Sequence, residues 1–522
     1  MNFKVLISAI FASAIAVSGC SDDGSSGTAG SGGTAGTGGT AGTGGTAGTG
    51  GTGGTGGTPE PKTCDDIPET SSYIVEGAPP TADDDCAVTL DPTGEDDHIQ
   101  IINALVDNDF GPGAALCLTA GNWDMGGTIG ITDDPGMTFK GIGDSPDDVV
   151  LDYADETRTC RGAKGFNVGV NNVTIENLWV KNTCENAVEQ RDTDGSVFRK
   201  LMVSWDDYCE GPAAPENCGA ECGSEAPCDN ERLSCVDGVC VGNSTLNGAY
   251  GIYPTDCQNT LVEYSQVEGA SDAGIYVGKC TGGSVENNIV YENVAGLEVE
   301  NCVDVDASNN IAFDNVGGLF ALQQDISGSM QSNNGVRFFD NESYCNNRRN
   351  FAKEGSAVAG IPVGTGVLSF AGNGVEFFGN VISDNQTLGI GMASNILNCQ
   401  VAGSDCPPYN DGYDPFVKNN YIHDNVFTNN GTDPTGDFGS LFKILGFGTA
   451  GGPPVPDVVW DGYKEMPSDV GLCLGTDADA AASVLVIGEA CQEPINPSFA
   501  EYIMCAETNN STDQAPYLCE PS

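Results

Sequence analysis

The chain has 522 residues, enough for one large core with appended segments. It carries 74 acidic and 19 basic side chains, and its formal net charge of −55 disfavours nucleic acid as a partner. Polyanionic sugars should also be repelled unless a divalent cation bridges them to the protein. Because 39% of the residues are hydrophobic, the composition is not that of a disordered chain.

Residues 1–20 are typical of a targeting segment. Lys4 precedes a short apolar run that ends in "VSGC", and this run is too short to span a membrane. The ending resembles a bacterial lipobox, in which cleavage precedes Cys20 and that cysteine is lipidated. The alternative is an ordinary signal peptide with an incidental cysteine. We favour the lipid anchor, which predicts a location in the bacterial cell envelope. Ser21, the residue after the cysteine, indicates the outer membrane or cell surface.

Residues 21–58 consist mainly of "TAGTGG" repeats, which have almost no side chains to bury. Such a segment is a flexible linker. We therefore expect a folded part that begins near Pro59 and is tethered to the membrane.

The 22 cysteines of an exported chain predict disulfides. Six of them fall within 209–241, a span that suits a disulfide-stapled insert too small for a core of its own. A zinc site is the alternative, but the insert has no histidine. Without Cys20 the number of cysteines is odd, so one thiol should be left free. A second stapled region is expected near the end of the chain, at Cys473, Cys491, Cys505 and Cys519.

A short phrase recurs every 22 or 23 residues, as in "YGIYPTDC", "AGIYVGKC" and "AGLEVENC". Its apolar and polar residues alternate as they do in strands, and Gly, Asn and Asp punctuate the phrases as turns require. A period of this length built from strands and turns predicts a β-solenoid. Leucine-rich repeats have a similar period, but their leucine pattern is absent. The glycines that align are Gly251, Gly274, Gly296, Gly318, Gly366 and Gly389.

Stacked turns place equivalent residues above one another in ladders. Asn288 should therefore lie next to Asn310, and Asn293 next to Asn315, where inward amides satisfy the backbone of the turns. A further ladder of cysteines is expected from Cys257, Cys280 and Cys302.

The ends of the solenoid also have signals. Residues 93–109 predict an amphipathic helix that covers the first turn, and 113–132 predict the first strands. Coil turns should continue to about residue 434, so we expect a β-helix domain over 59–434. The remaining residues, 435–522, predict an irregular, disulfide-containing C-terminal region.

The stretches "INALVDNDFGPGAALCLTAGNWDMGGTIGIT", "MTFKGIGDSPDDVVLDY" and "NGAYGIYPTDCQNTLVEYSQVEGASDAGIYVGKC" resemble bacterial right-handed parallel β-helix repeat proteins of the pectin-lyase-like superfamily. The resemblance covers roughly residues 95–400. It implies an all-β, right-handed parallel β-helix. It implies no single activity, because the superfamily contains polysaccharide lyases, glycoside hydrolases, epimerases and non-catalytic adhesins.

One stripe of the repeat is a candidate binding surface. If Ile252 and its equivalents point inward, the next residue of each strand points outward. Stacked outward aromatics would offer a platform for sugar rings, but a loop or the C-terminal region could instead cover them as part of the core. The predicted ligand-binding residues are Tyr253, Tyr276, Glu298 and Phe320.

Acidic residues gather in neighbouring turns, next to one of the few lysines. Paired carboxylates could act as general acid and base on a glycosidic bond, and hard oxygen ligands at Asp206 and Asp207 could instead hold calcium. The alternative is that these acids only shape the corners of the solenoid. The candidate catalytic residues are Asp192, Asp194, Asp206, Asp207, Asp256, Asp272 and Lys279.

With two histidines in the chain, a histidine-rich metal centre and a Ser-His-Asp triad are disfavoured. Three hypotheses stay open: an enzyme acting on polysaccharide, a non-catalytic module that binds glycan or protein, and a structural envelope protein. We favour a lipid-anchored envelope protein that binds or processes carbohydrate.

Overall fold

The computed structural model describes residues 60–518, with gaps at 71, 80–84, 156–158, 210–216, 224–226, 229–231, 237, 327–332, 397–408, 411, 466–468, 476–481 and 488–509. The predicted signal peptide, Cys20 and nearly all of the linker lie outside the described residues. Within the described part of the chain, every helix is too short or too polar to cross a membrane.

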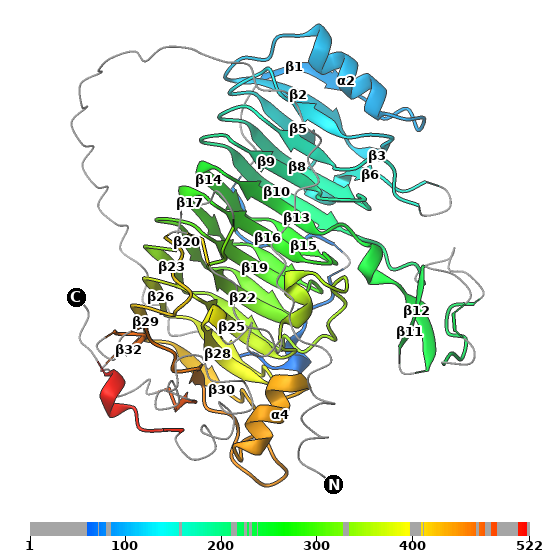
Figure 1. Ribbon diagram of the computed structural model, residues 1–522. Coiled ribbons are helices and arrows are strands. Elements are labelled where there is room, and N and C mark those ends of the chain that lie inside the picture. The colour runs from blue at the N-terminus through cyan, green and yellow to red at the C-terminus, as the bar shows by residue number, and fades with distance from the viewer. Residues whose placement is uncertain are drawn as a thin grey trace, which may run out of the picture.

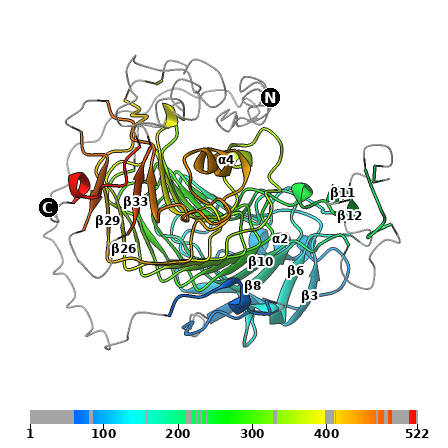
Figure 2. The same ribbon diagram turned by 90° about the horizontal axis from the view of Figure 1, so that it is seen from below.

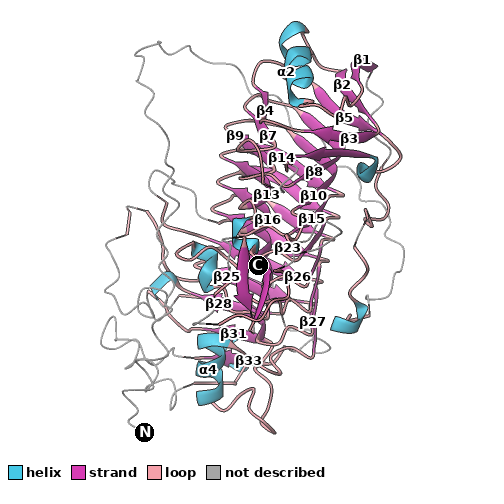
Figure 3. Cartoon of the chain, turned by 90° about the vertical axis from the view of Figure 1, so that its right-hand side faces the viewer, coloured by secondary structure: helices cyan, strands magenta, loops and turns pink. Residues whose placement is uncertain are grey.

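The described strands form a coil in which each turn pairs in parallel with the turns above and below it (Figures 1 and 3). Sheet A has 20 strands arranged in two rows, and sheet B has 11 strands on the remaining face. The two long strands β8 (Thr174–Lys181) and β10 (Val197–Ser204) run through both rows of sheet A. The predicted all-β parallel helix is therefore confirmed.

The strands follow one another in a regular order along the coil. The first row of sheet A also contains β1 (Asp85–Leu90), β2 (Ala114–Thr119), β5 (Thr138–Ile142), β14 (Gln258–Glu263), β17 (Thr281–Glu286), β20 (Asp306–Ser308), β23 (Val336–Phe339), β26 (Val375–Phe378), β29 (Asn420–His423) and β32 (Leu472–Leu474). Its second row contains β3 (Gly121–Asp124), β6 (Val149–Asp152), β15 (Gln266–Glu268), β18 (Ile289–Tyr291), β21 (Ile311–Phe313), β24 (Glu342–Tyr344), β27 (Val381–Ser383) and β30 (Val426–Thr428). Sheet B contains β4 (Ile129–Ile131), β7 (Phe166–Val168), β9 (Val188–Arg191), β13 (Tyr250–Thr255), β16 (Ala273–Gly278), β19 (Ala295–Glu300), β22 (Gly317–Leu322), β25 (Thr365–Phe370), β28 (Leu388–Ala393), β31 (Val458–Trp460) and β33 (Val484–Val486).

Two ladders of buried asparagines run along the inside of the corners, as predicted. Asn310 shows the pattern: its Oδ1 accepts from the backbone N–H of Asn288 at 3.0 Å, and its Nδ2 donates to the carbonyl oxygen of Val285 at 2.9 Å. The residue before it, Asn309, has a φ of 54°, a left-handed conformation that asparagine tolerates at tight corners. The ladders are Asn288, Asn310, Asn341, Asn380 and Asn425, and Asn293, Asn315, Asn346, Asn385 and Asn430.

Both ends of the coil are covered. Helix α2 (His98–Asp107) lies over the first turn with Ile101 and Ala104 buried, as the sequence predicted (Figure 1). At the other end, β31 and β33 extend sheet B and β32 extends sheet A. The coil therefore continues past residue 434, into the region that was expected to be irregular. Helix α4 (Gly436–Ile444) packs beside this end of sheet B (Figure 2).

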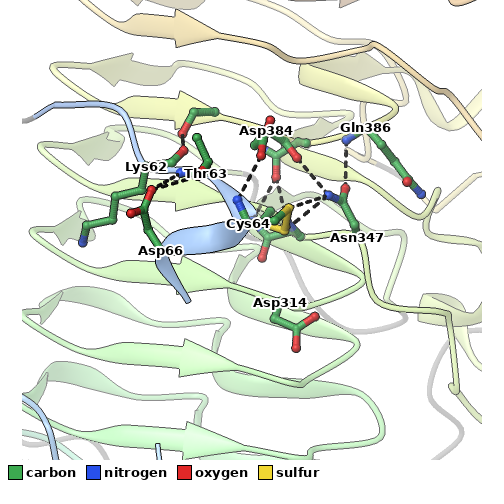
Figure 4. Close-up of a disulfide and its surroundings, with 12 residues drawn as sticks. Lys62, Thr63, Cys64, Asp66, Asp314, Asn347, Asp384 and Gln386 are labelled. Atoms are coloured by element: carbon green, nitrogen blue, oxygen red, sulfur yellow. Dashed lines mark hydrogen bonds between the residues drawn. A yellow bond between two sulfur atoms is a disulfide. The ribbon is translucent and has the colours of Figure 1, made fainter. Parts of the chain in front are cut away.

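Residues 60–70 and 72–75 form a strap along the second row of sheet A, which the sequence did not reveal. The disulfide between Cys64 and Cys345 joins residues 281 positions apart, and Cys64 N–H donates to Asp384 at 2.9 Å (Figure 4). Further along, Tyr291 Oη donates to the carbonyl oxygen of Thr70 at 3.2 Å. The strap covers the stacked rings of this row and fastens several turns together.

The insert near 209–241 projects from the side of the coil as the antiparallel hairpin of β11 (Leu233–Val236) and β12 (Val239–Gly242) (Figures 1 and 2). Its sulfurs form disulfides, as predicted, and not a zinc site. In the ladder of cysteines, Cys257 pairs with Cys280, and Cys302 is the free, buried thiol among the described residues. The insert pairs are Cys209–Cys218, Cys222–Cys235 and Cys228–Cys240.

Candidate functional site

The outward side chains of sheet B form rows along the coil, because consecutive strands pair in register. The middle row contains Glu189 and Tyr253, then Tyr276, Glu298 and Phe320. The rings of Tyr253 and Tyr276 stack with their centroids 4.8 Å apart. The row therefore changes along the coil from polar and aromatic to acidic, and then to apolar.

The next row lies closer to the carboxyl ends of the strands and contains Gly278 beside Glu300. A Cβ atom at Gly278 would overlap the ring of Tyr276, so only glycine lets this ring lie flat across the strand. The Tyr276 hydroxyl donates to Glu300 Oε1 at 3.1 Å, and Gln324 Nε2 donates to Glu300 Oε2 at 2.8 Å. Both oxygens of Glu300 are therefore held by neutral donors.

Glu298 and Glu300 form a buried carboxyl pair, 3% and 4% exposed. Burial raises the pKa of Glu298 well above its ordinary value, and the charges of Glu300 and Asp272 raise it further. Burial also raises the pKa of Glu300, but hydrogen bonds from Glu298, Tyr276 and Gln324 oppose the shift. The pKa of Glu298 is therefore raised with less opposition than that of Glu300, so that within the pair Glu298 holds a proton more readily and Glu300 accepts the hydrogen bond. Oε2 of Glu298 accepts no hydrogen bond from a described donor.

A third acid, Asp272, stands just before β16 and adds to this cluster. The pKa of Asp272 is raised to about 7, mainly by burial and to a smaller extent by the charge of Glu300, while a hydrogen bond with Tyr250 opposes the shift. The rings of Tyr250 and Tyr253 stack with centroids 4.4 Å apart. We call Tyr250, Tyr253, Asp272, Tyr276, Glu298 and Glu300 the acid–tyrosine cluster.

A line of alternating charges borders the cluster at the carboxyl ends of the strands. Asp256 Oδ2 lies 3.3 Å from Lys279 Nζ and 3.5 Å from Arg191 Nη1. Glu189 Oε1 lies 2.7 Å from Lys164 Nζ at the start of this line. The charge of Lys279 lowers the pKa of nearby Glu300, so this line helps to keep Glu300 ionised.

The cluster is covered by other parts of the chain. Ile361 follows the short helix η4 (Ala357–Gly360) and packs on the apolar side chains around Tyr276 and Phe320, which are 5% and 0% exposed. Tyr253 is half-buried. Of the two interpretations of the aromatic stripe, burial under a loop is thus the one the structure supports for Tyr276, Glu298 and Phe320.

The structure divides the predicted catalytic residues among different places. Asp256 and Lys279 meet at one corner, and Asp192 follows Arg191 at the same corner, exposed and with a φ of 56°. In a nearby turn, Asn259 Nδ2 donates a hydrogen bond to Asp194 Oδ1 at 2.9 Å. These positions match the corner chemistry that was the alternative interpretation.

Asp272 does not join Asp256, because the two lie at opposite ends of adjacent six-residue strands. The candidate acids of these neighbouring turns therefore do not form one group. The reason is that equivalent positions stack, and these two residues are not equivalent in the repeat.

Asp206 and Asp207 stand at the corner that leads into the insert. Asp206 Oδ1 lies 2.8 Å from Lys181 Nζ, and Asp207 Oδ1 accepts from the backbone N–H of Cys209 at 2.7 Å. Among the described residues, no three carboxylates come close enough together to hold an ion. Calcium at this corner stays a prediction, and the neighbouring ammonium group makes it a poor environment for a divalent cation.

Sequence reasoning missed Glu300, Tyr250 and Gln324. The phrase "LEVEN" held the signal for Glu300, because residues two apart in a strand share a face and Glu298 had already been placed outward. Gln324 gave no such signal, since it follows the last residue of β22 and reaches back across one turn.

A family model described as "Right handed beta helix region" matches residues 164–334, which include the whole acid–tyrosine cluster. The chain contains a right-handed β-helix. The handedness implied by the resemblance to the pectin-lyase-like superfamily is thereby confirmed. No curated protein matches the sequence.

Several solved structures resemble the β-helix at a distance. The A-module of a mannuronan C-5 epimerase from Azotobacter vinelandii is 12% identical, with a TM-score of 0.40 over 73% of this chain and 88% of that chain. A mannuronic acid specific polysaccharide family 6 lyase from human gut microbiota is 11% identical, with a TM-score of 0.35 over 71% and 79%. A hyperthermoactive exopolygalacturonase from Thermotoga maritima is 12% identical, with a TM-score of 0.33 over 61% and 76%. Likenesses this distant carry no conclusion about activity.

Proposed function

We propose that this protein is a lipid-anchored enzyme of the bacterial cell envelope that hydrolyses a neutral glycan, with Glu298 as general acid and Glu300 as its carboxylate partner. The observation that carries the proposal is the buried Glu298–Glu300 pair on the outward face of sheet B. The many disulfides support a site of action outside the cytoplasm. The lipobox-like ending at Cys20 supports the anchor.

Hydrolysis of a glycosidic bond needs one carboxylic acid that protonates the leaving oxygen and one carboxylate that activates water or attacks the sugar. The unequal pKa values of the pair assign these roles without further groups. When substrate binds, the hydrogen bond from Glu298 to Glu300 would be replaced by one from Glu298 to the glycosidic oxygen. Tyr276 would meanwhile hold Glu300 in its ionised form.

Access to the pair requires Gln324 to move, because its side chain lies on Glu300. Gln324 also forms part of the wall of a neighbouring cavity, so its movement would open the pair to that cavity. The half-buried ring of Tyr253 offers an apolar face to a sugar that arrives from the other side.

The charge of the site favours a neutral glycan over a polyuronate. Three acids form the cluster. A uronate carboxylate would be repelled by the ionised Glu300, and the nearby cations of the described chain, Lys279 and Arg191, already pair with Asp256. Lyase and epimerase chemistry, which acts beside such a carboxylate, is therefore less well supported than hydrolysis.

The proposal is tested by incubating the purified protein with neutral and acidic polysaccharides, with and without Ca²⁺, and by identifying products with mass spectrometry. We expect shortened neutral oligosaccharides that disappear in Glu298→Gln and Glu300→Gln. Glu286→Gln is the matched control, because Glu286 lies on β17 of sheet A with a raised pKa. Loss of products in Glu286→Gln as well would remove the assignment to the pair.

A non-catalytic glycan-binding role is the second candidate, and the stack of Tyr250, Tyr253 and Tyr276 favours it. A folded protein that forms no product across the panel but binds a neutral glycan, and loses this binding in Tyr253→Ala, would establish binding in place of catalysis.

A further inference from the structure

Beside the acid–tyrosine cluster, sheet B carries an apolar cavity of about 110 Å³. Its floor is the apolar continuation of the outward rows, with Phe320 and Leu368 among its residues, and its walls come from η4 and from Phe438 and Phe442 of α4. Apolar cavities of about 150 Å³ stay dry and bind small hydrocarbons such as benzene. This cavity has the size and lining for a short alkyl or acyl chain.

The cavity is continuous with the acid–tyrosine cluster. Phe320 pairs with Glu298 and Leu322 pairs with Glu300 in the next strand, so the cavity floor begins one strand spacing, roughly 4.8 Å, from the carboxyl pair. Gln324 belongs to both places, since it lines the cavity and donates to Glu300 at 2.8 Å. A ligand that reaches the pair from this side must therefore pass along apolar walls.

We infer that the natural ligand is a neutral glycan bearing a short acyl or alkyl substituent, with the substituent in this cavity and the sugar at the acid–tyrosine cluster. This inference rests on the proposed function and deepens it by naming the substrate class. The polar cluster and the apolar cavity lie on adjacent strands and match the two halves of such a molecule. An unsubstituted sugar would leave the apolar walls unused, whereas a plain lipid would leave the carboxyl pair without a partner.

The cavity is tested first without any sugar, by calorimetric titration of the full-length protein with straight-chain alcohols from ethanol to hexan-1-ol. Each methylene buried in the cavity should tighten binding about fourfold until the cavity is filled. Two variants narrow the cavity, one from the wall and one from the floor: Ala357→Phe on η4 and Ala393→Leu on β28. Each should weaken hexan-1-ol binding at least about tenfold, and Glu298→Gln should leave it unchanged.

The second arm links the cavity to the glycan. For any neutral glycan that the protein cleaves, the glycosidic bonds of its butyryl ester should be hydrolysed faster than those of the unsubstituted glycan. Hexan-1-ol should inhibit hydrolysis of the butyrylated glycan and not that of the unsubstituted one. Absence of alcohol binding, or binding that does not depend on chain length and survives both variants, would overturn the inference. Equal cleavage of both glycans would also overturn the inference, but it would not contradict the proposed role of the carboxyl pair. That role is tested separately, by the loss of cleavage expected in Glu298→Gln.

Discussion

Two sets of buried polar side chains occur in the same turns of the coil, and they differ in how their polar atoms are satisfied. Asn310 and Asn315 are fully buried, and each binds backbone groups and the asparagines of adjacent turns. Glu298 is equally buried, but its Oε2 lacks a donor among the described residues, and its pKa is strongly raised. We therefore expect the first set to stabilise the coil and the second set to destabilise it.

This difference separates structural from functional polarity. A neutral amide that meets matching donors and acceptors costs nothing to bury, and its repetition explains the ladders without chemistry. A pair of carboxyls loses solvation and repels when both are charged, and such perturbed pairs are found preferentially at functional sites. The acid–tyrosine cluster is thus the place in the described turns to which we assign the proposed function.

The largest effect on stability should come from breaking a ladder. Asn315→Ala removes the acceptor of two bonds from Asn293 and the donor of a bond to the carbonyl oxygen of Val290. Each buried group left unpaired costs about 1–3 kcal/mol, so we expect a fall in Tm of roughly 5 °C or more by calorimetry. The control is Gln258→Ala, an exposed side chain at the start of β14, with a change of about 1 °C or less. Equal Tm values for both variants would remove the structural role of the ladder.

Replacing the acid should have the opposite sign. Glu298→Gln keeps the size and a donor but removes a group that can ionise, so Tm at pH 7 should rise by roughly 1–3 °C while product formation falls by a factor of about 100 or more. A lower Tm in Glu298→Gln would mean that the carboxyl stabilises the fold, and the contrast with the ladders would then be wrong.

A smaller effect should appear in the pH dependence of stability. The pKa values of Asp272, Glu268 and Asp461 are raised to about 7, mainly by burial, from an ordinary value near 4. Between pH 4 and 7 the folded state therefore binds more protons than the unfolded state, so stability falls as pH rises and levels off above about pH 7. We expect Asp272→Asn to lose part of this slope in Tm measured from pH 4 to 8. Identical slopes for Asp272→Asn and the wild type would contradict the raised pKa of Asp272.

The smallest effect should follow from changing a corner acid. Asp192 is exposed and has a φ of 56°, and asparagine accepts this conformation as readily as aspartate does. Asp192→Asn should therefore change Tm by less than about 1 °C and product formation by less than about twofold. A large loss of activity would instead indicate that the active site lies at the corner where Arg191, Asp256 and Lys279 meet.

The fold could be predicted from the sequence because a repeat imposes its own register. Spacings of 22 and 23 residues predict that Asn288 lies next to Asn310 and Cys257 next to Cys280, and the structure confirms both contacts. The strap of residues 60–70 and 72–75 could not be predicted in this way. It has no period, and its position depends on a disulfide between Cys64 and Cys345, far apart in the chain.

The site was only partly predictable for a related reason. The outward positions of Tyr276 and Glu298 followed from strand alternation, and both belong to the cluster. The grouping of Asp272 with Asp256 failed, because proximity along the coil does not place residues at the same end of a strand. Burial of the stripe depended on a loop around Ile361 from a distant part of the sequence, and periodicity carries no information about such a cover.

The most direct test of the central claim measures whether Glu298 holds a proton at neutral pH. Infrared difference spectra between the wild type and Glu298→Gln at pH 7 should show the loss of a protonated carboxyl C=O band. Glu286→Gln, recorded in the same way, gives the reference for a carboxyl outside sheet B. Loss of the protonated band in Glu298→Gln would support a proton available for transfer at this pair. Loss of an ionised carboxylate band in its place would contradict the assignment of Glu298 as the acid.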